Sequence, residues 1–293
     1  MIKKVAIYGK SVNEDFFYYF SNLVKKLENN NIDILCYKPL LEGILNTYNY
    51  QFKTLGTFTS YYDIDSGIDL MFSIGGDGTF LETLQIIIDK NIPVLGINSG
   101  RLGFLATISK EEIQKAIEKL IEGKFCTEQR SILQLVSGID NGSFKFALND
   151  ITIQKKDSTL ITIHTYLNDD FLNSYWSDGL IIATPTGSTA YSLSVGGPIV
   201  IPYSKNFIIS PIAPHNLSVR PIVVPDNFKI SLFIESRSSK FTITLDHRVE
   251  ECCFSEPIII KKAPFYMNII KLDYVSFYET LRNKLMWGID KRN

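Results

Sequence analysis

A glycine-rich turn around one carboxylate is the feature of this sequence that most directly suggests a chemical role. Residues 75–79 read Gly-Gly-Asp-Gly-Thr, after the apolar run Ile68–Ile74 and before a helical pattern that starts at Thr79. Glycines let the backbone approach a phosphate chain, and the free N–H groups of a helix start favour an anion. The turn is neither a Walker loop nor a G-x-G-x-x-G fingerprint. Asp77 is either a helix N-cap in a tight turn or part of a phosphate site, and the preceding strand favours the phosphate site.

A second candidate site follows Ser177-Asp178 and carries no charge from Gly179 to Ser204. Its first residues, GLIIA, predict a strand, and Thr-Pro-Thr-Gly then leads into a short helix whose first N–H groups would face a pocket. Tyr191 in that helix offers a face on which a base could stack. The alternative is a proline-containing turn with Ser and Thr capping. The segment is long enough to span a bilayer, but its prolines and hydroxyl groups would be poorly satisfied in lipid, so we expect no membrane span.

Two smaller motifs place polar side chains near predicted strands. Asn149 and Asp150 could together hydrogen-bond a ribose or a base, although an Asn-Asp pair is otherwise typical of a turn. His215, in the segment Pro214–Pro221, is more typical of a structural residue than of a catalytic one.

The elements that must position these residues begin with alternating strands and helices, which indicate a parallel sheet with crossover helices. The predicted strands are Lys4–Tyr8, Ile32–Tyr37, Ile68–Ile74 and Ile92–Ile97, and the predicted helices are Asn13–Glu28 and Thr79–Asp89. Residues 38–67 have weak periodicity, so we expect an irregular or mobile segment there. Ser109 and Glu112 form a capping box for the next helix, which we expect to end at Gly123.

Beyond Gly123 the hydrophobic period changes to two, which predicts mostly antiparallel strands. These are Ser143–Gln154, Thr159–Leu167, Phe171–Trp176, Leu180–Ala183, Phe228–Glu235, Phe241–Leu245, Arg248–Phe254, Pro257–Lys261 and Phe265–Ile270. The tail Tyr274–Leu285 returns to helical spacing. We therefore predict an α/β domain with a parallel sheet over residues 1–98, joined by a returning C-terminal helix within 272–293, and a β-rich domain over residues 99–271.

Composition excludes several classes of protein. Thirty Lys and Arg against 31 Asp and Glu give a net charge of -1, which argues against a generally basic nucleic-acid binder. A hydrophobic content of 45% with 21% charged residues excludes a mainly disordered chain. Four Cys without C-x-x-C spacing and three scattered His predict neither a disulfide scaffold nor a zinc cluster. A reducing cytoplasm fits this usage, and the N-terminus is too briefly apolar for a signal peptide.

Taken together, the motifs resemble those of bacterial NAD kinases. The resemblance runs from about residue 70 to the C-terminus and rests on Gly75–Thr79, Asn98–Leu105, Asn149-Asp150, Ser177–Pro198 and Pro214–Pro221. The Gly-Gly-Asp-Gly turn also occurs in diacylglycerol kinases, sphingosine kinases and phosphofructokinases, whereas TPTGSTAYSLSVGGP is much more specific. The resemblance implies transfer of the γ-phosphate of ATP to the adenosine 2′-hydroxyl of NAD, with a divalent metal, usually Mg²⁺, accompanying ATP. It also implies a cytoplasmic homodimer or homotetramer.

The resemblance further implies roles for individual residues. Asp77 would orient or deprotonate the 2′-hydroxyl, Gly76 and Gly78 would contact the nucleotide, and Asn149 would hold the adenosine half of NAD. The other implied binding residues are Asp150, Trp176, Asp178, Thr189, Ala190, Tyr191, Ser192, Leu193, Ser194 and Arg248. No side chain is assigned as a metal ligand. Phosphoryl transfer depends on positioning and charge neutralisation more than on covalent help, so such a set is chemically sufficient.

Three positions depart from the family pattern. Asp150 stands where relatives often have Glu, Trp176 where many have Arg, and Arg248 where they often have Gln. Arg101 or Arg248 could supply the lost positive charge, although either is more typical of a solvated surface.

Two other functions remain as alternatives. A lipid kinase of the diacylglycerol-kinase type would share the glycine turn, but it would lack the Thr-Pro-Thr-Gly block and would expose an apolar membrane-docking surface. A sensor that binds NAD or NADP without turnover would have no need of a base at Asp77.

Overall fold

The computed structural model describes residues 2–288, with gaps at 139–142, 237–239, 254–255 and 274; residue 1 and residues 289–293 are not described. The chain forms two compact units, which are Met1–Glu128 with Met267–Asn293, and Gln129–Tyr266. The expected division after residue 98 falls inside the first unit. The reason is that helix α4 (Ile113–Ile121) buries its apolar face in the same core as the first helix.

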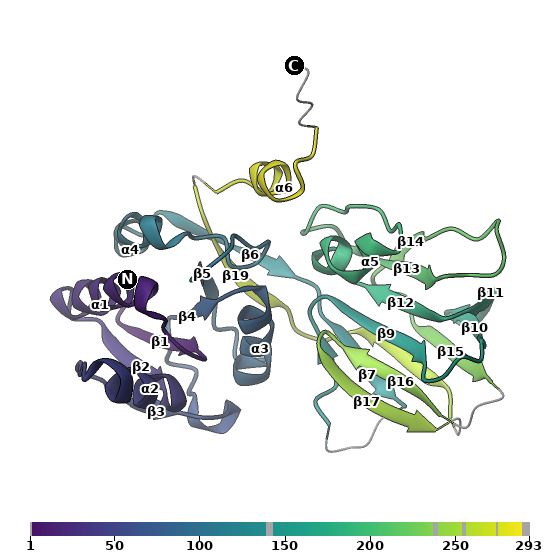
Figure 1. Cartoon of the computed structure of the whole chain (residues 1–293), viewed down its shortest axis with the longest axis horizontal. Helices are drawn as coiled ribbons and strands as arrows, with labels where there is room; N and C mark the ends of the chain where they lie inside the picture. Colours follow the sequence, from purple (N-terminus) through teal and green to yellow (C-terminus); the bar gives the residue numbers. More distant parts are fainter. Residues whose placement is uncertain (1, 139–142, 237–239, 254–255, 274, 289–293) are drawn as a thin grey trace. The chain divides into compact units, whose positions relative to one another are not determined.

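The first unit contains a seven-stranded sheet in the order β3-β2-β1-β4-β5-β19-β6 (Figure 1). Its strands are β1 (Lys4–Gly9), β2 (Asp33–Tyr37), β3 (Gly56–Phe58), β4 (Leu70–Gly75), β5 (Val94–Asn98), β6 (Phe125–Arg130) and β19 (Met267–Leu272). The pairs from β3 across to β19 are parallel, which confirms the predicted class of sheet. The run Phe265–Ile270 was expected in the β-rich domain, and this was wrong. Ile270 and Leu272 complete the core of the first unit instead.

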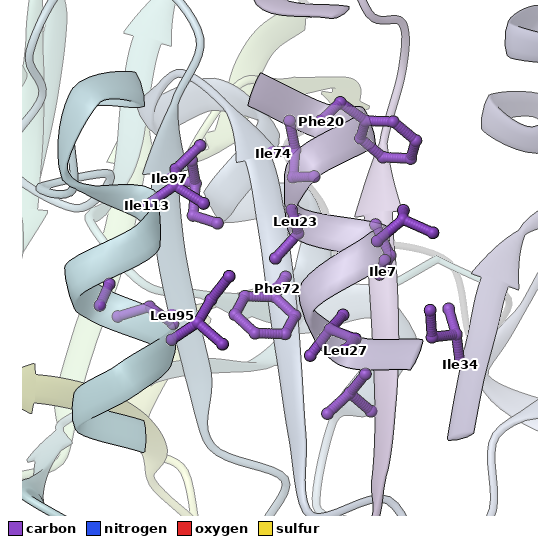
Figure 2. Close-up of a cluster of buried hydrophobic side chains, with 14 of the residues drawn as sticks. Ile7, Phe20, Leu23, Leu27, Ile34, Phe72, Ile74, Leu95, Ile97 and Ile113 are labelled. Carbon is purple, nitrogen blue, oxygen red and sulfur yellow. The ribbon is translucent and has the colours of Figure 1, made fainter. Parts of the chain in front are cut away.

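Helices cover both faces of this sheet. They are α1 (Glu14–Asn29), α2 (Lys38–Tyr48), α3 (Asp77–Ile87), α4 and α6 (Phe277–Leu285), with short 3₁₀ turns at Tyr61–Asp63 and Lys110–Glu112. Figure 2 shows Phe20, Leu23 and Leu27 of α1 directed toward sheet residues such as Ile7 and Phe72. Helix α3 lies on the opposite face, because Phe80 packs against Gly96 while the next residues of β5, Leu95 and Ile97, face the α1 side.

The segment 38–67, expected to be irregular, instead contains α2, β3 and a 3₁₀ turn. Pro39 occupies the first turn of α2, and Leu40 and Ile44 are buried. The ring of Tyr48 stacks on Phe17 of α1 with 4.0 Å between centroids. Tertiary packing therefore stabilises a helix that local periodicity did not indicate.

The capping box of Ser109 and Glu112 is present, and Gly123 follows α4 with φ +72°. Both features confirm the predicted start and end of that helix.

The second unit consists of two six-stranded sheets, ordered β11-β10-β15-β18-β7-β8 and β14-β13-β12-β9-β16-β17. Their strands are β7 (Leu133–Ser137), β8 (Phe146–Ala147), β9 (Asp150–Lys155), β10 (Ile161–Leu167), β11 (Asp170–Ser177), β12 (Gly179–Ala183), β13 (Asn206–Ile212), β14 (Ile222–Pro225), β15 (Ile230–Glu235), β16 (Lys240–Leu245), β17 (Arg248–Cys253) and β18 (Ile258–Lys262). The pairs within each sheet are antiparallel, as predicted. One apolar core, to which both sheets contribute, holds the unit together.

Some predicted boundaries in this unit differ from the structure. The expected strand Ser143–Gln154 is interrupted between β8 and β9, because backbone N–H groups there bond a side chain instead of a neighbouring strand. Strands β7, β13 and β14 were not predicted. Phe254 and Tyr274, the ends of two predicted elements, lie outside the described residues.

Candidate active site

The glycine-rich turn lies at the carboxyl end of β4, where parallel sheets bind ligands. Gly75 has φ +155°, and a Cβ there would lie 2.6 Å from Cβ of Thr79, so the tight turn into α3 requires glycine. Gly76 is the N-cap of α3, and Asp77 is its first helical residue. The interpretation of Asp77 as the N-cap is therefore wrong. Its side chain does not cap α3, and the first N–H groups of α3 remain available to an anion.

The carboxylate of Asp77 accepts three backbone hydrogen bonds from the loop that follows β5. Phe104 N donates to Oδ2 at 2.8 Å, and Leu105 N and Ala106 N each donate to Oδ1 at 3.0 Å. The side chain is still 29% exposed. The carboxylate is thus held in one orientation while part of it faces solvent.

The same loop approaches Asp77 so closely that only glycine fits. A Cβ on Gly103 would lie 2.6 Å from Cγ of Asp77. Asn98, at the end of β5, fixes the start of the loop, since its side chain accepts from Gly100 N at 2.7 Å and donates to the carbonyl of Arg101. The motif Asn98–Leu105 therefore forms the support for the Asp77 carboxylate.

The C-terminal helix α6 brings a cation to this position. Nζ of Lys284 lies 3.6 Å from Oδ2 of Asp77 and 5.0 Å from the ring centroid of Phe104. The rings of Phe104 and Phe277 lie 6.4 Å apart between centroids. A cavity of about 340 Å³ separates part of α6 from residues 98–112.

In the second unit, Asp246 organises the Asn149-Asp150 motif. Its carboxylate accepts from the backbone N–H groups of Leu148, Asn149 and Asp150 at 3.0, 2.7 and 3.4 Å. Asp246 itself lies in the β16–β17 turn with φ +56°. Sequence reasoning missed this residue. An Asp in a turn directly after an apolar strand was the only local signal.

Asp150 is a buried carboxylate. Its side chain is bonded by the hydroxyl of Thr152 at 3.0 Å, and the residue is only 4% exposed. Burial and the nearby Asp246 carboxylate raise the pKa of Asp150 to about 7. Burial also raises the pKa of Asp246, although its backbone donors and Arg248 act in the opposite direction.

The turn after β12 is attached to the same motif. Thr184 donates from its backbone N–H to the carbonyl of Asn149 at 2.8 Å and from its hydroxyl to that of Leu148 at 2.6 Å. A Cβ on Gly187 would lie 2.9 Å from Cα of Asn149, so this approach also requires glycine. The structure therefore brings Asn149 beside the start of the Thr-Pro-Thr-Gly-Ser-Thr turn.

The short helix α5 (Tyr191–Ser194) presents some of its predicted residues and buries others. Tyr191 is 39% exposed, and Ser194 is also exposed. Thr189, Ala190 and Leu193 are partly buried. Ser192 is buried, with its hydroxyl 3.1 Å from that of Ser210, so it serves packing in this conformation.

Trp176 and Asp178 lie at the other end of β12. Strand rise puts Asp178 roughly 20 Å from Thr184, at about 3.3 Å per residue. Oδ1 of Asp178 pairs with Nζ of Lys155 at 2.6 Å. Trp176 is 55% exposed, and its ring lies 4.9 Å from that of His215. Lys155, which sequence reasoning missed, supplies positive charge beside Asp178.

Arg248 is not the solvated residue that we expected. Its Nε donates to the carbonyl of Leu245 at 3.2 Å, and its NH2 group donates to that of Phe146 and lies 3.8 Å from Asp246. The guanidinium therefore ties the β16–β17 turn to β8. Arg101 is exposed, as expected.

Among the residues that the structure describes, no group of three or more His, Cys, Asp or Glu is placed to hold a metal ion. Within the same residues, no helix combines the length and apolar character that crossing a membrane requires.

Two family models match most of the chain, and relatives match nearly all of it. The ATP-NAD kinase N-terminal domain matches residues 22–125, and the ATP-NAD kinase C-terminal domain matches residues 148–272. The NAD kinase of Cytophaga hutchinsonii is 44% identical over 290 residues, covering 98% of this chain and 99% of that protein. The NAD kinase of Flavobacterium psychrophilum is 43% identical over 300 residues, covering 99% and 100%.

Solved structures share the fold. Yeast NADH kinase complexed with NADH superposes with a TM-score of 0.84 at 24% identity, covering 99% of this chain and 89% of that chain. An NAD kinase from Archaeoglobus fulgidus in complex with ATP gives a TM-score of 0.73 at 24% identity, covering 97% and 99%. The family matches set aside the lipid-kinase and sensor alternatives. The chain belongs to the NAD kinase family, the ATP-dependent phosphotransferases that move the γ-phosphate of ATP to the adenosine 2′-hydroxyl of NAD to make NADP.

Proposed function

We propose that Asp77 receives the adenosine 2′-hydroxyl of NAD and directs its attack on ATP. The observation that carries this role is the hydrogen bonding of its carboxylate. A carboxylate offers about four acceptor positions. Two backbone donors occupy Oδ1, whereas Oδ2 has one backbone donor and the more distant Lys284. Oδ2 therefore retains one position at which a hydroxyl can donate.

The reaction is an in-line displacement. The 2′-oxygen forms a bond to the γ-phosphorus, the bond from that phosphorus to the β,γ-bridging oxygen breaks, and ADP leaves with the electron pair. The hydroxyl proton passes to Oδ2 of Asp77 and then to water. Because the transition state is loose, this transfer comes late, and the main contribution of Asp77 is to hold the oxygen in line.

The divalent metal enters with ATP as part of the substrate. The donors around Asp77 are N–H groups and an ammonium group, which bind anions and disfavour a cation. When bound, Mg²⁺ would neutralise charge on the ATP phosphates. Gly76, Gly78 and the first N–H groups of α3 would contact the nucleotide.

We further propose that two residues of the second unit, Asn149 and the exposed Tyr191, hold the adenosine half of NAD. Asn149 is fixed by Asp246 and by the turn at Thr184, so its position is pre-organised. Asp178 would bind a ribose or carboxamide group. We also propose nucleotide contacts at the remaining positions that the resemblance implies: Asp150, Trp176, Thr189, Ala190, Ser192, Leu193, Ser194 and Arg248.

We also propose that the protein is a cytoplasmic homodimer or homotetramer. No disulfide joins the four cysteines, all of which the structure describes, and Cys36 and Cys252 are buried, which suits a reducing compartment. Sedimentation of the purified chain would test the oligomeric state.

The decisive experiment replaces Asp77 with Asn. We expect kcat to fall by about 10²–10⁴, the range for loss of a general base, with NAD binding retained. Asp15→Asn is the matched control, because Asp15 is an exposed carboxylate in the first turn of α1. Steady-state NADP formation and NAD calorimetry would be measured on both. A folded Asp77→Asn enzyme with the kcat of the control would refute the role of Asp77.

A further inference from the structure

Helix α6 lies beyond the segments that the two family models match, which end at residue 272. Its residues Thr280 and Leu281 are buried, so it is anchored to the first unit. From this anchored helix Lys284 reaches Asp77 and the face of the Phe104 ring. The C-terminal helix thus contributes a side chain directly to the candidate active site.

Lys284 stands at the acceptor position of Asp77 that the backbone leaves open. Oδ1 has both of its donors at 3.0 Å, and Phe104 N takes one position on Oδ2 at 2.8 Å. At 3.6 Å, the ammonium is an ion-pair partner of Oδ2 but is too distant for a good hydrogen bond. A substrate hydroxyl can therefore take the position without breaking a short bond.

The reaction brings two negatively charged groups together beside Asp77. The γ-phosphoryl group is anionic and must approach an oxygen that is hydrogen-bonded to the Asp77 carboxylate. Like charges at this range repel, and a cation held beside both reduces the repulsion. Lys10, another cation after a strand of the same sheet, pairs with Glu82 at 2.6 Å. Among the described residues, Lys284 is the cation that forms an ion pair with Asp77.

We propose that Lys284 is a catalytic residue of this phosphoryl transfer. When the 2′-hydroxyl of NAD occupies Oδ2 of Asp77, the Lys284 ammonium moves from that oxygen to the transferring γ-phosphoryl group and stabilises its charge. The Phe104 face and the anchored helix keep the ammonium nearby during this exchange. The inference rests on the proposed role of Asp77, because it requires the hydroxyl at that residue.

The test compares Lys284→Gln, Lys284→Arg and the control Arg282→Gln, which removes an exposed charge from the same helix. We expect Lys284→Gln to lower kcat about 10²-fold, as for loss of one transition-state donor, with little change in the KM for NAD. Lys284→Arg should recover part of the loss. Thermal unfolding of each variant would establish that α6 remains folded.

Two outcomes would overturn the proposal. One is a kcat for Lys284→Gln equal to that of Arg282→Gln. The other is a lower KM for NAD with unchanged kcat, which would show that Lys284 only competes with the hydroxyl. Asp77→Asn, measured in parallel, separates the two hypotheses. If it abolishes turnover while Lys284→Gln does not, the role of Asp77 stands and that of Lys284 fails.

Discussion

Replacing Gly103 with Ala tests whether the loop after β5 holds the Asp77 carboxylate in place. The new Cβ would lie 2.6 Å from Cγ of Asp77 and 2.9 Å from its Oδ2, distances that real Cβ atoms do not tolerate. Either the loop or the carboxylate must then move, and the N–H groups of Phe104, Leu105 and Ala106 lose their acceptor. The carboxylate itself stays in the protein, so the variant perturbs orientation and not charge.

The expected loss of folding free energy follows from the three hydrogen bonds to Asp77. Bonds to a charged group contribute about 1.5–3 kcal/mol each when well shielded, and partial exposure of Asp77 reduces this to about 1 kcal/mol each. The loss is therefore about 3 kcal/mol. For a unit of this size that corresponds to a fall in Tm of roughly 6–12 °C. Misplacing the carboxylate by about 1 Å lowers kcat by up to about 10²-fold.

Gly100→Ala is the matched control in the same loop. A Cβ there meets nothing within 4 Å, so this variant carries the same change in unfolded-chain entropy without the clash. Urea unfolding and steady-state kinetics would be measured for both variants. If Gly103→Ala is as stable and as active as Gly100→Ala, the loop does not support Asp77, and the reasoning is refuted.

Two predictions concern the second unit. Tyr191→Ala should weaken NAD binding by about 1–3 kcal/mol, the range for base–aromatic stacking, as measured by calorimetry, and an unchanged Kd would remove Tyr191 from the site. Asp150 has a folded pKa of about 7, above its usual value, so the native state binds the extra proton between about pH 4 and 7 and loses stability as pH rises through that window. Asp150→Asn, which keeps an acceptor for Thr152, should therefore gain stability relative to wild type between pH 5 and pH 8 in chemical unfolding. A pH-independent difference would contradict the raised pKa.

Local patterns in the sequence were sufficient to predict the elements that carry the candidate site. An apolar run followed by Gly-Gly-Asp-Gly-Thr predicts a strand, a tight turn and a helix start, and β4 and α3 have that arrangement. The change of hydrophobic period from 3.6 to 2 indicated two kinds of domain, since periodicity reports which face of an element is buried. The Ser109 capping box depends on residues only three apart, so the sequence also predicted this helix start.

The partners of the candidate site residues became evident only from the folded chain. Asp77 accepts hydrogen bonds from a loop that parallel pairing of β4 and β5 brings beside it, and it forms an ion pair with a lysine on the last helix. Asp246 holds Asn149 because β16 pairs with β9 in the second unit. Helix α2 and the return of β19 likewise depend on packing with distant segments. Hydrophobic period and turn chemistry act over a few neighbouring residues. The contacts named above join residues far apart in the chain. The pairing of strands in the sheets determines which of these distant residues come into contact.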